Sequence, residues 1–274
     1  MNSLGWPVSI FADEAAGSFA DQLAFVKAEG FDAIEVRHAN GRNVSEFLDS
    51  DVQEIKDSGF PVHCIGSPVN KIHFDLSKES EEFDKFKRCI DVANQLGCER
   101  IRIFAPEPPA RPADARLYLD WLSPMAEWGK SHDVIVLLEN DGLFFGAYPY
   151  EAKTAFEELG GSHFKAIFDF SNCVLIGGKP FEEWISWIEP YLDTIHIKDS
   201  IFGTKEVVPA GQGEGRIVES LVYLARKGWQ GALAIEPHLS GRGPYGAYSG
   251  AENCHIAHEA LKDVLAKVEA EVNA

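Results

Sequence analysis

The sequence predicts a single parallel (β/α)8 barrel, a TIM barrel that forms one domain over residues 1–274. Eight short, β-branched runs recur along the chain, and most are nearly continuous in apolar residues, as expected for parallel strands covered on both faces. Segments with helical periodicity separate them, and no linker interrupts the series. A doubly wound open sheet shares this alternation, but eight units and the missing GxGxxG fingerprint favour closure.

The predicted strands are VSIFAD (8–13), DAIEVR (32–37), PVHCIGS (61–67), RIRIFAP (100–106), VIVLLEN (134–140), KAIFDF (165–170), DTIHIKD (193–199) and ALAIEPH (232–238). The predicted helices cover 19–29, 44–58, 78–96, 113–132, 150–159, 181–188, 217–227 and the segment from 251 onward. For the third helix, Ser77 or Ser80 is the expected N-cap, and Gly97 follows its last residue. Pro124 is expected to kink or split the fourth.

Charge and cysteine usage restrict the class of protein. The chain has 25 basic and 43 acidic residues, a formal net charge of −18, which argues against nucleic acid or an anionic membrane as a partner. Its five cysteines are scattered without a CxxC pair, so neither a disulfide framework nor a thiolate zinc site is indicated. The first residues lack the pattern of a signal peptide, and no apolar run is long enough for a membrane span. We therefore expect a cytoplasmic protein.

Four metal-ligand side chains lie at the ends of four successive predicted strands: Glu139, Asp169, His196 and Glu236. In a parallel barrel this arrangement brings them together on the face that carries the active site. Alone, each has an ordinary structural explanation, such as a helix cap or a core histidine. Together they predict a divalent-metal site, because burying three carboxylates without a cation is costly. Oxygen and imidazole ligands favour Mn²⁺, with Mg²⁺, Co²⁺ or Zn²⁺ as alternatives.

The motifs IFADE, GSP, LLEN, FDxxN, HIKD and EPHL, spread along nearly the whole chain, resemble the xylose isomerase-like superfamily of sugar isomerases and epimerases. The Glu, Asp, His, Glu order is similar to that of the ketose 3-epimerases. That resemblance implies that the four strand-end residues bind the metal, and that Glu139 and Glu236 are also the acid/base pair. Two positions depart from the epimerase pattern: Lys198-Asp199 replaces Gly-Glu after His-x, and Asn172 replaces a histidine.

Six further residues near the predicted strand ends are candidates for substrate binding: Lys71, Arg102, Asn172, Lys198, Asp199 and His238. Each has an ordinary alternative, such as an ion pair with a neighbouring carboxylate. Asp13 and Glu14 lie at the end of the first predicted strand, where they could belong to the site or could equally cap the following helix. GQGEG at 211–215 is interpreted as a turn, with a phosphate cradle as the alternative. The glycine-rich loop 238–250 is either a cover over the pocket or a surface loop.

These residues suit proton transfer next to a carbonyl group. A metal stabilises the negative charge of an enediolate, and two carboxylates can remove and return the proton. The sequence therefore predicts a metal-dependent isomerase or epimerase whose partner is a keto-sugar or a sugar phosphate. The alternatives are a metal-dependent lyase or dehydratase acting on a keto-sugar or an inosose, and a non-catalytic sugar-binding protein. The sequence leaves a homo-oligomer open.

Overall fold

The chain forms one closed barrel of eight parallel strands, as predicted. A computed structural model describes residues 3–239 and 249–274, so most of the predicted loop 238–250 lies outside the described residues. The strands follow one another around the barrel in the order β1-β12-β9-β8-β7-β6-β5-β2. They are β1 (Val8–Phe11), β2 (Ala33–Val36), β5 (Val62–Gly66), β6 (Arg100–Ile103), β7 (Ile135–Glu139), β8 (Phe164–Asp169), β9 (Leu192–Ile197) and β12 (Ala232–Ile235). Each of the eight predicted strands is confirmed.

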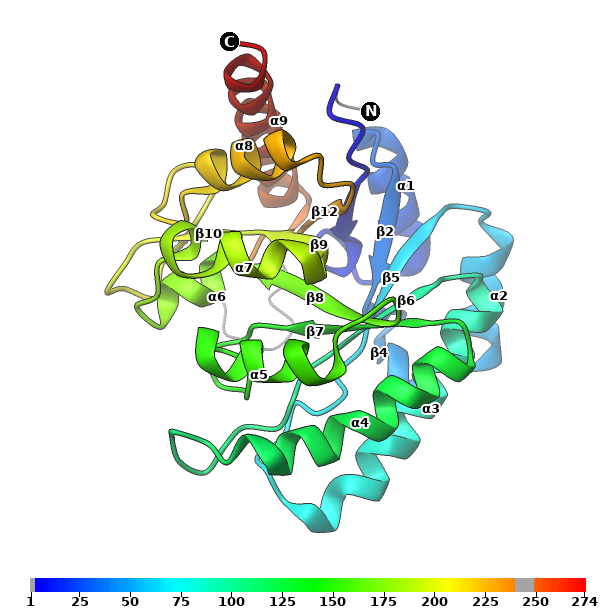
Figure 1. Cartoon of the computed structure of the whole chain (residues 1–274). Helices are drawn as coiled ribbons and strands as arrows, with labels where there is room; N and C mark the ends of the chain where they lie inside the picture. The colour runs from blue at the N-terminus through cyan, green and yellow to red at the C-terminus, as the bar shows by residue number, and fades with distance from the viewer. Residues whose placement is uncertain (1–2, 240–248) are drawn as a thin grey trace.

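Helices pack around the outside of this barrel (Figure 1). They are α1 (Phe19–Glu29), α2 (Asp49–Asp57), α3 (Glu79–Leu96), α4 (Ala115–Ser131), α5 (Pro149–Leu159), α6 (Phe170–Leu175), α7 (Ser186–Ile188), α8 (Ile217–Lys227) and α9 (Ala251–Val272). The predicted bounds of α1 and α8 are confirmed. The predicted helix 44–58 begins instead with a separate 3-10 turn, Val44–Glu46, and the segment 181–188 begins with a π-helical turn, Phe181–Ile185.

The N-cap of the third predicted helix is different in the structure. Asp75, rather than Ser77 or Ser80, caps the start of the α3 region, because its side chain accepts from Ser77 N in the preceding 3-10 turn. Gly97 does end α3, in the left-handed conformation with φ 66°. Pro124 lies inside α4 without splitting it, and Asp114 caps that helix.

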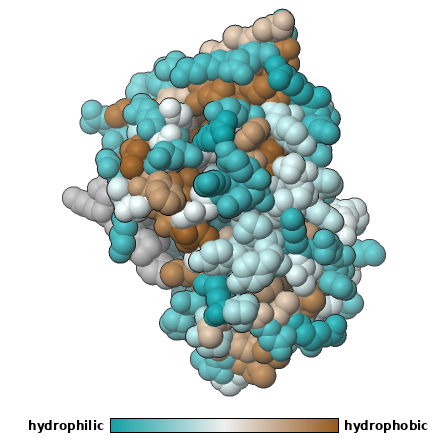
Figure 2. All heavy atoms as spheres, turned by 60° about the vertical axis from the view of Figure 1, so that its left-hand side comes forward, coloured by the Kyte–Doolittle hydropathy of each residue, from teal (hydrophilic) through white to brown (hydrophobic). Residues whose placement is uncertain are grey.

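The core forms between the barrel and its helices. Strand side chains such as Ile10, Ile101 and Ile235 are fully buried, and Trp6 packs edge-on against Trp229, with 5.2 Å between the ring centroids. Both chain ends lie at the same end of the molecule (Figure 1), where Ser3 N donates to Glu269 Oε1. The face seen in Figure 2 is mostly hydrophilic, with apolar side chains in separate patches. Among the described residues, no helix combines the length and apolar character needed to cross a bilayer.

Short elements that the sequence did not predict follow the strands where they leave the barrel. A hairpin of β3 (His38–Ala39) and β4 (Arg42–Asn43) follows β2, and a hairpin of β10 (Asp199–Ser200) and β11 (Val207–Val208) follows β9. Helix α6 begins directly after β8. In TIM barrels, this end carries the active site.

Candidate metal centre and active site

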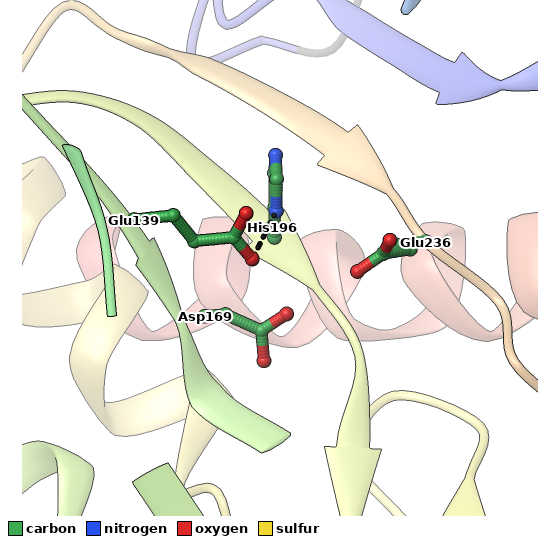
Figure 3. Close-up of side chains that lie close together, drawn as sticks. All are labelled: Glu139, Asp169, His196 and Glu236. Atoms are coloured by element: carbon green, nitrogen blue, oxygen red, sulfur yellow. Dashed lines mark hydrogen bonds and ion pairs between the residues drawn. The ribbon is translucent and has the colours of Figure 1, made fainter. Parts of the chain in front are cut away.

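Glu139, Asp169, His196 and Glu236 form a buried cluster at the carboxyl ends of four adjacent strands (Figure 3). Glu139 and Asp169 are the last residues of β7 and β8, His196 lies near the end of β9, and Glu236 directly follows β12. One possible ligand atom from each residue lies within 4.8 Å of the others. Each residue is at most 4% exposed. The structure therefore brings together the four residues that were predicted from the sequence to form a metal site.

Glu139 has polar partners on two sides. His196 Nδ1 and Asn172 Nδ2 both lie 3.2 Å from Oε1, and Arg102 Nη1 lies 3.2 Å from Oε2. Burial alone would raise the pKa of Glu139, but the nearby His196 and Arg102 outweigh this effect and lower it to about 2. Glu139 is therefore a carboxylate that can accept a proton.

Asp169 is held by the start of α6. Its Oδ1 accepts from Asn172 N at 2.8 Å, and its backbone exchanges two hydrogen bonds with the Asn140 side chain. The other oxygen, Oδ2, lies 3.0 Å from Lys198 Nζ and accepts no hydrogen bond. Burial, with the nearby charges of Glu139 and Glu236, raises the pKa of Asp169 to about 6 even though Lys198 opposes the shift.

Glu236 lies between two cations. Arg37 Nη1 donates to its Oε1 at 2.8 Å, and Lys198 Nζ donates to its Oε2 at 2.7 Å. Burial would raise the pKa of Glu236, but Lys198, His238 and Arg37 together lower it well below its usual value. Glu236 is therefore also ionised, although both of its oxygens are already hydrogen-bonded.

Sequence reasoning missed Arg37, which connects three carboxylates. Its Nε donates to Asp13 at 2.8 Å, its Nη2 donates to Glu14 at 2.7 Å, and its Nη1 reaches Glu236. Asp13 and Glu14 thus belong to the charged network, and the cap of α1 is Ser18. One signal was available: DAIEVR ends in a charged residue at the same relative position as the four chosen residues.

Phe11 is the apolar contact that the two arginines share. The Arg37 guanidinium lies 4.6 Å from the centroid of its ring and the Arg102 guanidinium 5.2 Å from it. The same ring meets His196 edge-on, with 5.2 Å between centroids. A Cβ on Gly66 would lie 2.7 Å from Phe11, so the glycine leaves room for the ring. Phe11 therefore supports the cations that contact Glu139 and Glu236.

The cluster fits a hard divalent cation. Glu139 Oε2, Asp169 Oδ2 and His196 Nε2 are buried and make no hydrogen bond among the described residues, although the two carboxylate oxygens form ion pairs with Arg102 and Lys198. Three carboxylates and one imidazole supply the oxygen and nitrogen donors that such ions bind. A cation would satisfy polar atoms that are otherwise costly to bury. The buried group could therefore hold a metal.

Five of the six predicted substrate-binding residues lie around this cluster or at its rim. Arg102, Asn172, Lys198 and His238 contact the glutamates directly, with His238 Nε2 lying 3.5 Å from Glu236 Oε1. Lys71 lies farther out, where its Nζ is 3.6 Å from Asp141 Oδ2 and 4.5 Å from the centroid of the Phe104 ring.

Asp199 is different, because backbone N–H groups surround its carboxylate. Oδ1 accepts from Ser200 N and Gly215 N at 2.9 Å, and Oδ2 accepts from Gly211 N and Gly213 N at 3.0 Å. The side chain is fully buried. A carboxylate offers about four lone-pair positions, and here four donors use them. The prediction that Asp199 binds substrate directly is therefore not supported by this geometry, and GQGEG is a turn wrapped around Asp199.

Three solved structures show how widely this fold is shared. A D-tagatose 3-epimerase-like protein is 15% identical, with a TM-score of 0.80 and coverage of 97% of this chain and 99% of that one. An IolI protein with a bound zinc atom is 17% identical (TM-score 0.78; 96% and 99%). The probable 3-DHS dehydratase AsbF from Bacillus anthracis is 15% identical (TM-score 0.72; 94% and 98%). At these identities, the similarity concerns the fold.

Sequence comparisons give two further results. A search among curated proteins finds no significant match. The family model described as "Xylose isomerase-like TIM barrel" matches residues 23–260, which include all four residues of the buried cluster. This match covers most of the chain and confirms the resemblance found in the strand-end motifs. The chain therefore belongs to the xylose isomerase-like TIM barrel family.

Proposed function

We propose that this protein is a divalent-metal-dependent sugar isomerase or epimerase that transfers a proton next to the carbonyl group of a keto-sugar. The observation that carries the proposal is the placement of two buried glutamates around Asp169 and His196. Glu139 ends β7 and Glu236 follows β12, while β8 and β9 lie between them in the barrel. A substrate held between the glutamates would present a different side to each carboxylate.

Each residue has a separate part in this reaction. When bound, the metal would polarise the substrate's carbonyl oxygen and the hydroxyl oxygen on the neighbouring carbon, and so make the C–H of that neighbouring carbon more acidic. Glu139, Asp169, His196 and Glu236 would hold it, and Mn²⁺ is the expected ion. One glutamate would remove the proton, and the other would return a proton to the opposite face for epimerisation. Arg102, Asn172, Lys198 and His238 would bind substrate oxygens and keep the glutamates in place.

A dehydratase is the second candidate, and Lys198 favours it. Its ammonium group lies 2.7 Å from Glu236 Oε2 and 3.4 Å from His238 Nδ1. If Glu236 removed the proton, Lys198 would be a nearby acid that could protonate a departing hydroxyl group. A structural neighbour described as a probable dehydratase agrees with this alternative. The paired glutamates still favour an isomerase or epimerase, because expulsion of water requires only one base.

Metal removal and product analysis test the proposal together. The full chain is freed of metal with a chelator, checked by elemental analysis, and reloaded separately with Mn²⁺, Mg²⁺, Co²⁺ or Zn²⁺. Each form is incubated with keto-sugars and an inosose, and the products are identified by NMR and mass spectrometry. We expect isomers of unchanged mass, formed only by metal-loaded protein. Turnover by metal-free protein would contradict the proposal, and a main product lighter by one water would establish the dehydratase instead.

A further inference from the structure

We propose that the substrate carries no phosphate group, because the chain's own Asp199 fills the loop in which a phosphate would bind. This inference rests on the proposed function and narrows its substrate class to uncharged keto-sugars and related ketopolyols. In many TIM barrels the loops after the seventh and eighth strands hold a phosphate. Counted along the chain, β9 is the seventh of the eight barrel strands, and GQGEG lies in the loop between β9 and the eighth strand, β12.

The loop provides an anion-binding concavity that is already filled. The N–H groups of Gly211, Gly213 and Gly215, with that of Ser200, converge on the Asp199 carboxylate at 2.9 to 3.0 Å. Convergent backbone N–H groups of this kind bind phosphate oxygens in other proteins. A Cβ on Gly213 or Gly215 would overlap Asp199, so the glycines allow the backbone to close around it. The backbone donors of this loop are therefore occupied by an internal anion.

The cationic side chains that the structure describes at the site are also engaged. Arg37 contacts three carboxylates and Lys198 contacts two, while Arg102 and Lys71 each contact one. A phosphate dianion bound to any of them would compete with these carboxylates. Except at Lys71, that competition would leave a buried carboxylate without its cation, which is costly. The net charge of −18 adds a long-range field that disfavours anions.

The hydroxyl groups of a sugar can bind the polar groups around the cluster more favourably than a phosphate can. Arg102 Nε is buried without a hydrogen-bond partner among the described residues. Asn172 and His238 are only partly buried, and each has amide or imidazole groups that can bind a hydroxyl. A sugar hydroxyl both donates and accepts, so it can bind these groups without displacing an ion pair. The polar groups around the cluster therefore suit an uncharged polyhydroxy substrate.

Matched pairs of compounds test this substrate class. Metal-loaded protein is given D-fructose and D-fructose 6-phosphate, then D-xylulose and D-xylulose 5-phosphate, and kcat/KM is measured for each. We expect the free sugar of a pair to be favoured by at least about tenfold. A preference for the ester would overturn the inference and leave the proposed function intact.

Binding separates failure of the inference from failure of the proposed function. Calorimetry with xylitol and xylitol 5-phosphate gives affinities that do not depend on turnover. Tighter binding of xylitol supports the inference even if neither sugar reacts, in which case only the proposed function fails. Tighter binding of the ester, or binding of neither compound, overturns the inference.

Opening the loop provides an independent test. Asp199→Ala removes the internal anion, and Asp75→Ala is the matched control, because Asp75 also accepts a backbone N–H but lies at the start of the α3 region. We expect inorganic phosphate to raise the Tm of Asp199→Ala, but not that of the control or the wild type. Equal stabilisation of the wild type would overturn the proposal, as would no shift in a folded Asp199→Ala. If the variant does not fold, the wild-type measurement decides.

Discussion

Arg37 Nη1 donates to Glu236 Oε1 at 2.8 Å, which connects the end of β2 to one of the two proposed proton-transfer groups. The same guanidinium binds Asp13 and Glu14, so one buried cation pairs with three carboxylates. Arg37 is therefore a positioning residue for Glu236. Its pKa is far above the ordinary value because those carboxylates outweigh the effect of burial, so it stays charged at any working pH.

Replacing Arg37 should damage both stability and turnover. Arg37→Met leaves Asp13 and Glu14 buried without their cation, which should cost about 3–5 kcal/mol in the free energy of unfolding. Arg37→Lys should recover only part of the loss, since an ammonium lacks the fork of donors that reaches three carboxylates. The control is Arg42→Met, which removes a half-exposed partner of Asp51. Urea unfolding gives the stability, and kcat at saturating substrate reports the position of Glu236. An unchanged kcat in folded Arg37→Met would contradict the positioning role.

Lys198→Met should strengthen metal binding and weaken turnover. Lys198 Nζ lies 3.0 Å from Asp169 Oδ2 and 2.7 Å from Glu236 Oε2, so its charge competes for atoms that a metal would use. Removing the charge should tighten Mn²⁺ binding by about tenfold or more, measured by calorimetry. Lys165→Met is the control, because Lys165 pairs with Asp193 outside the cluster. Weaker Mn²⁺ binding by Lys198→Met would show that the lysine organises the ligands instead of competing with the metal.

Gly213→Ala should be strongly destabilising. An added Cβ would overlap Asp199 Oδ1, which accepts from Ser200 N and Gly215 N, and Ser200 O, which accepts from Glu214 N. We expect a loss of about 1–3 kcal/mol, typical of overpacking, measured by urea unfolding. Gly161→Ala is the matched control, because nothing lies within 4 Å of its Cβ position. Equal stability of the two variants would contradict the tight closure of the loop around Asp199.

Acid should weaken the contact between α9 and α1. His258 stacks on Phe31 with 4.2 Å between ring centroids and lies 3.1 Å from Glu29, and burial lowers its pKa from 6.5. A lowered pKa means that this stabilisation is complete above about pH 6.5 and is lost as the pH falls through the folded-state value, at most about 1.4 kcal/mol per pH unit. His258→Gln should therefore lose less stability than the wild type between pH 7 and pH 5, as measured by urea unfolding at each pH. His255→Gln, which changes an exposed neighbour of Glu29, should behave like the wild type.

The sequence was sufficient for the barrel and for the four clustered residues, because both depend on a simple geometric rule. Short, β-branched apolar runs such as VIVLLEN are typical of buried strands, and the ends of adjacent parallel strands meet at one face. The register confirms this for Asp169 and His196, which are direct neighbours on β8 and β9. The position of a residue on its strand was therefore enough to predict convergence.

What the sequence did not reveal was the pairing of charges. Arg37 is separated from Glu236 by most of the chain. Nothing in the sequence indicated which of the many lysines and arginines would pair with Asp13, Glu14 and Glu236. The environment of Asp199 was also hidden, since its partners are backbone N–H groups whose direction depends on the conformation of the loop. Phe11 looked like any core aromatic until its contacts with Arg37 and Arg102 were known.

Proton transfer by two glutamates is the central claim, and single-turnover NMR in D₂O tests it most directly. Glu139→Gln and Glu236→Gln each keep an oxygen ligand but cannot accept a proton, whereas Asp169→Asn and His196→Ala should mainly weaken metal binding. Glu35→Gln is the control. Glu35 is also a buried glutamate, but it lies outside the cluster, where it accepts a hydrogen bond from the Ser9 hydroxyl.

With metal content matched to the wild type, turnover should fall by about 10²- to 10⁴-fold in each of the two glutamine variants. The control should keep its turnover and its incorporation of solvent deuterium next to the carbonyl carbon. Near-wild-type turnover in either Glu139→Gln or Glu236→Gln, with metal bound, would contradict the account.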